Sequence, residues 1–332
     1  MMSLDQMNFE EYSVARRAMS ENSSLLDMGE HNLYGSLPLS FPGRFSKVAQ
    51  SDDPKGQYRC HVAELFVERW GMPAAEKARA SICEGVRAAL GAVFSMLAAE
   101  GKTVLIPSDV YPEYIRLAVR SGVRTMFYEA RLGAPSVEAL AAVDSALICD
   151  PLKPWGGHLD RQECARLAAW AMEKPKDRLL IADCAYGIDD AGAGKAWRDG
   201  AQALVLSSLS KGWLAPRRAG CAMAPLAWVE RVRAAIGAMA KNSGGLREAY
   251  SCLGGYSERP AAVASAISER VEEACRILGA DAGSLSLAGY FLLSEEPASA
   301  WLAKGIVAMP CSVFGSERSG SFLSVLAPVH RE

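Results

Sequence analysis

A lysine and an arginine follow one apolar stretch of the sequence at a spacing that suits covalent chemistry beside a phosphate. Lys211 comes three residues after the run 203–208, and Arg218 lies seven residues further on. A lysine amine attacks carbonyl carbons and forms a Schiff base when its surroundings suppress its charge. Arginine binds phosphate through its planar guanidinium, and the nearby hydroxyls of Ser208 and Ser210 suit the same group. Taken alone, the segment also fits a surface lysine at the end of a strand.

An acidic residue ends a second apolar stretch. Asp183 follows the run 178–182, and Tyr186 comes three residues later. Aspartate at such a place is often the N-cap of the helix that follows a strand. A carboxylate buried behind an apolar strand also needs a partner, because an isolated buried charge is unfavourable. The pattern indicates either a helix cap or one member of a charged pair.

Both positions belong to a regular alternation of apolar strands and amphipathic helices. We expect strands over 103–107, 124–129, 145–149, 178–182 and 203–208, and helices over 59–70, 84–99, 112–120, 136–141 and 160–173. This alternation predicts a three-layer α/β/α fold with a mostly parallel sheet that helices cover on both faces. Sites in such folds gather at the carboxyl ends of the strands, where Lys211 and Asp183 are expected.

The two ends of the chain have a different pattern. Residues 1–55 are rich in Ser, Gly, Pro and Asp, which predicts an arm that contributes to a small domain or wraps a partner. After Gly220 we expect helices near 226–240 and over 259–279, and strands over 289–293, 305–309 and 322–326. The predicted organisation is an arm over 1–55, a large domain over 56–240 and a small α+β domain over 241–332.

The composition excludes several classes of protein. The 332 residues include 36 basic and 38 acidic side chains without a clustered basic face, which argues against a nucleic-acid partner. No apolar run approaches the roughly 20 residues of a membrane span, and residues 1–12 lack the apolar core of a secretory signal. The nine cysteines and four histidines show no zinc-ligand spacing. We therefore expect a cytoplasmic protein with buried, reduced cysteines, no metal site and no membrane partner.

Together, the residues at the strand ends resemble those of the class I and II aminotransferases. This is the aspartate-aminotransferase-like group of fold type I enzymes, which use pyridoxal 5'-phosphate, and the resemblance covers about residues 56–327. Lys211, in Ser-Leu-Ser-Lys, looks like the family's Schiff-base lysine, and Arg218, in Arg-Ala-Gly, looks like its phosphate-binding arginine. Ser208 and Ser210 stand where the family places hydroxyls near the phosphate.

Further motifs extend the resemblance. In the segment that ends Asp-Cys-Ala-Tyr, the resemblance implies that Asp183 pairs with the pyridine nitrogen of the cofactor. It also implies that Tyr186 donates a hydrogen bond to the phenolic oxygen of the cofactor ring. Such a carboxylate raises the pKa of the nitrogen, so the ring stays protonated and accepts electrons. Tyr111, in Pro-Ser-Asp-Val-Tyr-Pro-Glu-Tyr, resembles the tyrosine that stacks on the ring, although it also fits a tyrosine at the edge of a core. Gly85 and Val86 resemble the turn whose backbone amides face the phosphate.

Three positions depart from the family pattern. Lys153, in Asp-Pro-Leu-Lys-Pro-Trp-Gly, replaces an asparagine that donates to the phenolic oxygen. Its ammonium either stabilises the phenolate, which we expect, or points away and leaves this to Tyr186. Leu323 stands in place of the arginine that holds the substrate carboxylate, so either Arg318 or another basic residue substitutes, or the substrate lacks a carboxylate there. Ser51 stands where many relatives have a tyrosine that reaches the partner subunit.

The resemblance implies a homodimeric aminotransferase. Lys211 would hold the cofactor and then act as general base, while Asp183 keeps the ring protonated. We expect a small amine or amino acid and a keto acid as substrates, and an unusual substrate from a specialised biosynthetic pathway would fit the change at position 323. The same residues would also serve a lyase, a decarboxylase or a condensing enzyme. A third interpretation is a non-catalytic binding module with the same fold.

Overall fold

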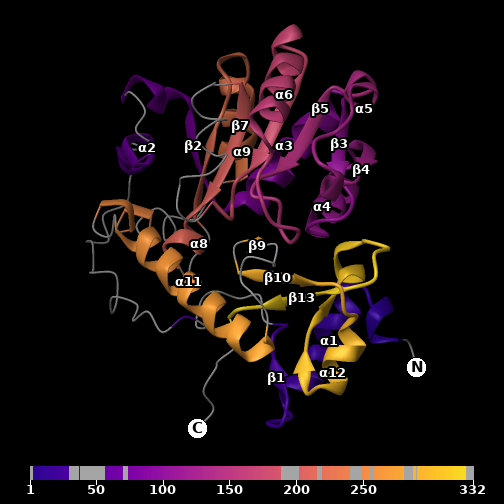
Figure 1. Ribbon diagram of the computed structural model, residues 1–332. Helices are drawn as coiled ribbons and strands as arrows, with labels where there is room; N and C mark the ends of the chain where they lie inside the picture. Colours follow the sequence, from indigo (N-terminus) through magenta and orange to yellow (C-terminus); the bar gives the residue numbers. More distant parts are fainter. Residues whose placement is uncertain are drawn as a thin grey trace.

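The computed structural model shows a larger sheet, a smaller sheet and a separate pair of strands, with helices around them (Figure 1). It describes residues 3–29, 37, 57–69, 74–187, 202–214, 219–239, 249–250, 252–254, 258–279, 287–288 and 290–326. Among the described helices, none combines the length and the apolar character that crossing a membrane requires. All the cysteines whose side chains are described are buried.

The larger sheet has seven strands in the order β2-β8-β7-β6-β5-β3-β4. Their bounds are β2 (Ala80–Cys83), β3 (Thr103–Pro107), β4 (Arg124–Tyr128), β5 (Ser145–Cys149), β6 (Leu179–Asp183), β7 (Ala203–Ser208) and β8 (Gly220–Met223). β8 is antiparallel to both of its neighbours, whereas the pairs from β7 to β4 are parallel. Every residue of β5 and β6 is buried, as expected for strands covered on both faces.

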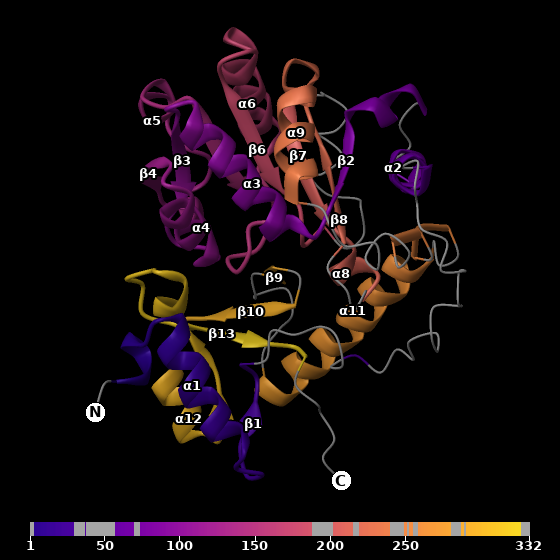
Figure 2. The same ribbon diagram turned by 180° about the vertical axis from the view of Figure 1, so that it is seen from behind.

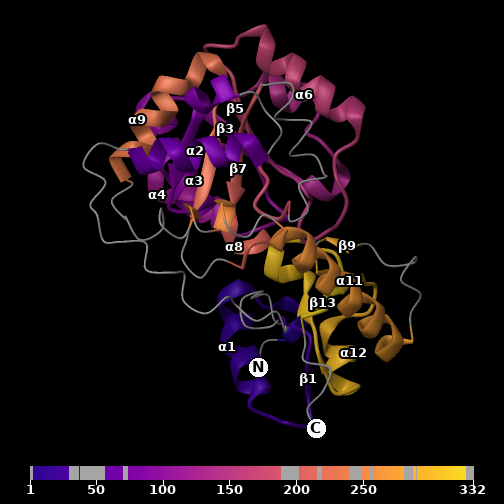
Figure 3. The same ribbon diagram turned by 90° about the vertical axis from the view of Figure 1, so that its left-hand side faces the viewer.

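Alternate residues of these strands belong to two separate cores. Leu147, Leu179 and Leu204 pack in one core with α3 (Val86–Ala99), α4 (Glu113–Ser121) and α9 (Val229–Met239). The opposite face packs against α2 (Gln57–Arg69) and α6 (Arg161–Glu173). Figure 3 shows α3, α4 and α9 on one side of the sheet and α6 on the other. This is the expected three-layer α/β/α arrangement.

The smaller sheet has four antiparallel strands in the order β12-β13-β10-β9. Its strands are β9 (Leu287–Ala288), β10 (Phe291–Ser294), β12 (Met309–Pro310) and β13 (Ser321–Ser324). α11 (Arg259–Leu278) contacts α8 (Leu209–Gly212) at the end of β7, and α12 (Ala298–Ala303) precedes β11 (Ile306–Val307). Short helical segments complete the fold: η1 (Leu4–Gln6), η2 (Ala74–Arg79), η3 (Ala130–Leu132), α5 (Val137–Ala141), η4 (Leu226–Trp228) and η6 (Cys311–Phe314).

The N-terminal segment is more regular than expected. Residues 9–20 form α1 (Phe9–Ser20), which begins with a capping box between Asn8 and Glu11. The following strand β1 (Leu26–Asp27) pairs with β11, and Figure 2 shows α1 and β1 in the part of the molecule that contains α12. The predicted arm over residues 1–55 did not include this helix and strand.

The sequence prediction also missed strands near the site. β2 occupies 80–83, directly before the helix that was expected to begin at residue 84, and β8 continues the large sheet after β7. Both strands are four residues long and contain small side chains such as alanine, serine, glycine and cysteine, which have weak strand preference. In the tail, the expected strand 305–309 is split into β11 and β12.

Candidate functional site

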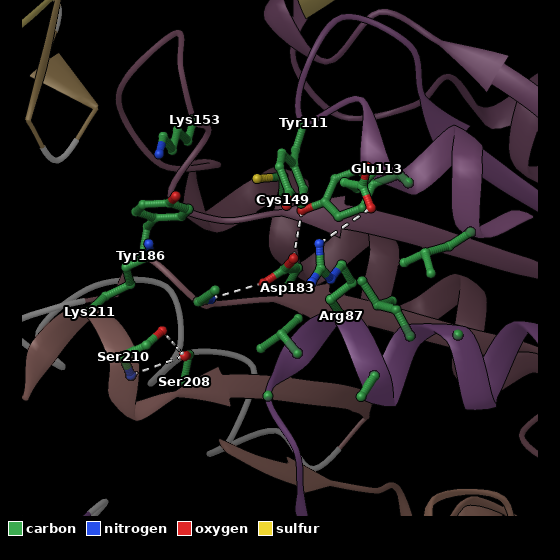
Figure 4. A pocket seen from close by; sticks show the side chains of 18 of the residues that line it. Arg87, Tyr111, Glu113, Cys149, Lys153, Asp183, Tyr186, Ser208, Ser210 and Lys211 are labelled. Atoms are coloured by element: carbon green, nitrogen blue, oxygen red, sulfur yellow. Dashed lines mark hydrogen bonds and ion pairs between the residues drawn. The ribbon is translucent and has the colours of Figure 1, made fainter. Parts of the chain in front are cut away.

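The carboxyl ends of β5, β6 and β7 open into a pocket of about 940 Å³ that faces the smaller sheet. Figure 4 shows its polar side chains converging from these strand ends and from the loops after them. The smaller sheet and η6 contribute an apolar wall made of Phe291, Met309 and Phe314. Arg87, Glu113 and Arg120 line the part of the pocket that runs along α3 and α4.

Lys211 reaches this pocket because β7 ends in a hydroxyl-capped turn. The side chain of Ser208 accepts a hydrogen bond from the Ser210 backbone N–H at 3.2 Å, and the two hydroxyl oxygens are 2.7 Å apart. This cap begins the short helix α8, which carries Lys211. The Nζ atom of Lys211 lies 5.0 Å from the centre of the Tyr186 ring. Burial lowers the pKa of Lys211, which increases the fraction of neutral, reactive amine.

Asp183 is the last residue of β6 and lies in the floor of the pocket, 6% exposed. Its carboxylate accepts hydrogen bonds from the hydroxyl of Tyr114 at 2.6 Å and from the backbone N–H of Ala185 at 2.9 Å. Burial raises the pKa of Asp183, and the hydrogen bond from Tyr114 partly opposes this rise. A cation in the pocket would restore the charged form of this carboxylate.

Two tyrosines line the same pocket. Tyr186 follows β6, and in Figure 4 its ring lies between the amines of Lys153 and Lys211. Burial raises the pKa of Tyr186, so its hydroxyl stays protonated. Tyr111 follows β3, is 37% exposed, and contacts the ring of Tyr114 edge-on at 5.6 Å. Tyr111 therefore presents part of its ring to the open side of the pocket.

Lys153 belongs to the loop after β5 and is 8% exposed. It donates a hydrogen bond to the hydroxyl of Tyr290 at 3.0 Å, and its Nζ atom lies 3.5 Å from the centre of the Tyr186 ring. Burial lowers the pKa of Lys153 well below its usual value, and the nearby charge of Lys211 lowers it further. The side chain thus points across the pocket toward the smaller sheet.

The turn before α3 requires glycine. Gly85, the N-cap of α3, has a φ of 86°, which favours a residue without Cβ, and it lines the pocket together with Val86. On the neighbouring strand, a Cβ on Gly220 would lie 2.3 Å from the carbonyl oxygen of Ser207 and 3.4 Å from the Cα of Gly85. The first backbone N–H groups of a helix at such a turn suit a phosphate.

The structure brings most of the predicted site residues together. The pocket is lined by Gly85, Val86, Tyr111, Lys153, Asp183, Tyr186, Ser208, Ser210 and Lys211. Arg218 and Ser51 lie outside the described residues. Leu323 is buried in β13 and is not part of the pocket lining, and neither is Arg318, which pairs with Glu295. In the described part of the chain, no group of histidine, cysteine or acidic side chains could hold a metal ion.

Sequence reasoning missed several residues of the pocket. Tyr114 is the last residue of the motif that contains Tyr111, but it was not predicted as a site residue. Its three-residue spacing from Tyr111 is the signal that puts both residues on one helical turn. Phe291, which lines the pocket, and Tyr290, which contacts Lys153, carry no local signal, because only the folding of the smaller sheet brings them there. Phe9 lines the pocket from α1, at the other end of the chain.

The sequence and the fold are similar to those of known proteins. Residues 43–316 match the family model for aminotransferase class I and II. No curated protein matches the sequence significantly. The structure is similar to substrate-bound BacF from Bacillus subtilis, at 19% identity and a TM-score of 0.73, covering 98% of this chain and 94% of BacF.

Two other solved structures are similar over nearly their whole length. The aspartate aminotransferase of Thermotoga maritima has 18% identity and a TM-score of 0.73, covering 99% of this chain and 94% of that chain. YbdL from Escherichia coli, described with a methionine aminotransferase function, has 16% identity and a TM-score of 0.74, covering 95% and 92%. At these identities the likeness establishes the fold.

Proposed function

Because this chain belongs to the aminotransferase class I and II family, whose members use pyridoxal 5'-phosphate, we propose that Lys211 holds this cofactor in the pocket. The chain is a pyridoxal-phosphate-dependent aminotransferase. We further propose that its substrates are a small amine or amino acid and a keto acid. The observation that carries the proposal is the convergence of Lys211, Asp183 and Tyr186 in one pocket.

The donor groups of the pocket fit the cofactor. Asp183 is a buried carboxylate with a raised pKa, which suits a protonated ring nitrogen beside it. Ser208, Ser210 and the backbone amides at Gly85 and Val86 would bind the phosphate. Tyr111 presents a partly exposed ring on which the cofactor ring would stack. Arg218 is proposed as a further phosphate ligand on the strength of the motif alone.

When bound, the cofactor supplies an electron sink for the bond that breaks at the substrate carbon. The protein's own groups then control the proton. The Nζ atom of Lys211, whose pKa is lowered by burial, would remove the proton from the carbon that bears the amino group. The protonated hydroxyl of Tyr186 would donate a hydrogen bond to the ring oxygen of the cofactor. The apolar wall of Phe291, Met309 and Phe314 would exclude water.

We also propose the remaining organisation of the molecule. The division into an arm over 1–55, a large domain over 56–240 and a small domain over 241–332 stays a prediction. A homodimer in the cytoplasm is likewise proposed, supported by the resemblance of the sequence to dimeric enzymes. Sedimentation of the purified protein at several concentrations would test the dimer, and a single monomeric species would contradict it.

The cofactor site can be tested by chemical trapping. The protein, incubated with pyridoxal 5'-phosphate, should gain absorbance in the visible range, and borohydride should fix the cofactor on a peptide that contains Lys211. The variant Lys211→Ala should lose both signals. Trapping on another lysine in the wild-type protein would overturn the proposed site.

The type of reaction needs a separate measurement. An amine panel with a keto-acid acceptor should yield the corresponding new amino acid. Release of carbon dioxide or ammonia without amino transfer would instead place the protein among the lyases or decarboxylases that use the same residues.

A further inference from the structure

Lys153 is a buried lysine whose predicted role, to stabilise the phenolate of the cofactor, leaves its contacts with the smaller sheet unexplained. Its amine lines the pocket, and its hydrogen bond to the hydroxyl of Tyr290 at 3.0 Å connects the loop after β5 to the smaller sheet. Three aromatic rings surround the amine, with ring centres at 3.5 Å for Tyr186 and at 4.6 Å for both Tyr290 and Phe291. Such rings attract the ammonium form.

The charged groups around Lys153 do not neutralise it. Lys211 faces it from α8 and opposes its charge, whereas Asp183 on β6 and Cys149 on β5 act in the other direction. Within the described part of the chain, Lys153 forms no ion pair, and Asp183 is already bound to Tyr114 and to the backbone of Ala185. A buried ammonium is unfavourable unless an anion accompanies it. The pocket therefore offers a place beside Lys153 where an anion would restore the ammonium form that burial and Lys211 disfavour.

The surroundings of that place describe the molecule that would fill it. Lys153 and Lys211 lie on either side of the Tyr186 ring, and both side chains line the same pocket. Phe291, Met309 and Phe314 form the adjacent wall and suit an apolar body. The residue Leu323, in contrast, lies outside the pocket lining. An amino acid with an apolar side chain offers an amine for one lysine and a carboxylate for the other.

We propose that Lys153 binds the carboxylate of the substrate and is a specificity-determining residue for apolar amino acids. This inference rests on the proposed function, in which Lys211 holds the cofactor in the same pocket. A carboxylate oxygen would accept a hydrogen bond from Nζ of Lys153, which must then be protonated. Because burial and Lys211 favour the neutral amine in the free protein, binding would take up a proton.

The test uses the cofactor-loaded protein and two unreactive probes that differ only in charge. 3-Phenylpropionate carries a carboxylate and an aromatic body, and 3-phenylpropanamide is its neutral counterpart. Calorimetry should show that the acid binds the wild-type protein about tenfold or more tightly than the amide, as expected for a hydrogen bond between charged groups. In Lys153→Met, affinity for the acid should fall about tenfold or more, while affinity for the amide changes by less than about twofold.

Arg120→Met provides a matched control, because Arg120 is another pocket-lining cation on α4. It should leave the affinity for both probes within about twofold of wild type. Equal affinity of the wild-type protein for acid and amide, or no binding of the acid, would overturn the proposal. So would full retention of acid binding in Lys153→Met, or a loss that occurs in Arg120→Met instead.

A second measurement needs no variant. Binding enthalpies of the acid in buffers with different ionisation enthalpies should reveal proton uptake, and affinity for the acid should fall as pH rises from 6 to 9. The amide should show neither effect, and acid binding without proton uptake or pH dependence would contradict the proposal. Visible absorbance and borohydride trapping on Lys211 are checked in each protein, so failure of the cofactor site is distinguished from failure of the carboxylate site.

Discussion

The pKa of Asp183 is raised by burial, and burial lowers the pKa of Lys153 and of Lys211. In each case the pocket disfavours the charged form, because water is replaced by protein atoms. The partners that would favour these charges are a ring cation beside Asp183 and an anion beside Lys153. Without these partners, the burial of the three ionisable groups should lower the stability of the ligand-free protein at neutral pH.

Asp183→Asn should change the pH dependence of stability in the cofactor-free protein. Because the folded pKa of Asp183 is raised, its contribution to stability is complete below the unfolded pKa of about 3.9 and is lost as pH rises through the folded pKa. The variant lacks this decrease, so its free energy of unfolding should fall less than that of wild type between pH 4 and 7. Urea unfolding across this range checks the difference, and identical slopes would contradict it. Cofactor affinity should nevertheless fall.

Lys153→Met should stabilise the cofactor-free protein at neutral pH. The variant keeps the length of the side chain and removes a buried amine whose charged form is disfavoured. A gain of about 1 kcal/mol would raise the melting temperature by about 1–2 °C. A lysine with a lowered folded pKa becomes less destabilising as pH rises through that pKa, so the gap between the proteins should narrow toward pH 10. Scanning calorimetry at pH 7 and pH 10 measures both effects, and a destabilised variant would contradict them.

At the scale of elements, β8 fixes the turn that precedes α3. Gly220 begins β8 and pairs with Cys83 of β2 and with Ser208 of β7, so the turn at Gly85 lies against it. The backbone of three segments meets at this point without room for a Cβ. The close approach of these backbone segments therefore couples β7, which ends before Lys211, to α3, whose N-terminus faces the pocket.

Gly220→Ala should be strongly destabilising. Its Cβ would lie 2.3 Å from the carbonyl oxygen of Ser207, so backbone must shift, at an expected loss of about 1–3 kcal/mol. Gly237→Ala is the matched control, because Gly237 lies in α9 with open space around it and should gain about 0.5–1 kcal/mol. Chemical unfolding of both variants provides the comparison. An unchanged midpoint for Gly220→Ala would show that the turn is able to move.

The sequence predicted those elements whose burial in the fold is visible as an apolar pattern in their own residues. The fully buried runs of β5 and β6 and the apolar stripe of α3 gave the strands and helices close to their observed bounds. α1 was missed because only Tyr12 of its residues is buried, so the helix has almost no apolar stripe. β2 and β8 were missed because their small residues form strands only in contact with β7 and with each other.

The same distinction holds for the pocket. Lys211, Asp183 and Tyr186 were predictable, because each follows an apolar strand and strand ends meet at one edge of the sheet. The hydrogen bond between Tyr114 and Asp183, and the contact of Lys153 with Tyr290, depend on how distant segments pack. A single sequence contains no local pattern for such contacts.

At the scale of the whole molecule, both ends of the chain build one wall of the site. Phe9 of α1 and Met309 of β12 line the pocket together, and the side chain of Ser299 contacts Asp5. Figures 1 and 2 show α1 in the same part of the molecule as α12, and Figure 3 shows these two helices on opposite sides of β1. The position of α1 thus affects the shape of a pocket formed mainly by residues far from it in the sequence.

Two substitutions on α1 test whether this helix is packed into the core. Tyr12 is 2% exposed, and Tyr12→Ala should reduce the free energy of unfolding by about 3–5 kcal/mol, as expected for removal of a buried aromatic ring. Val14, on the same helix, is 70% exposed, and Val14→Ala should change stability by no more than about 0.5 kcal/mol. Denaturant unfolding compares the two variants. Equal stabilities would show that α1 does not contribute to the core.

The contact between the segment before α1 and η6 also concerns the order in which the protein is made. The hydroxyl of Ser312 donates a hydrogen bond to the carbonyl oxygen of Met7, across 305 positions of sequence. At a synthesis rate of about 5–20 residues per second, the first helix leaves the ribosome about 15–60 s before its partners exist. During that interval, the apolar side chains of Phe9 and Tyr12 have no final surface to cover. The beginning of the chain therefore stays without its packing partners until the last strands have been synthesised.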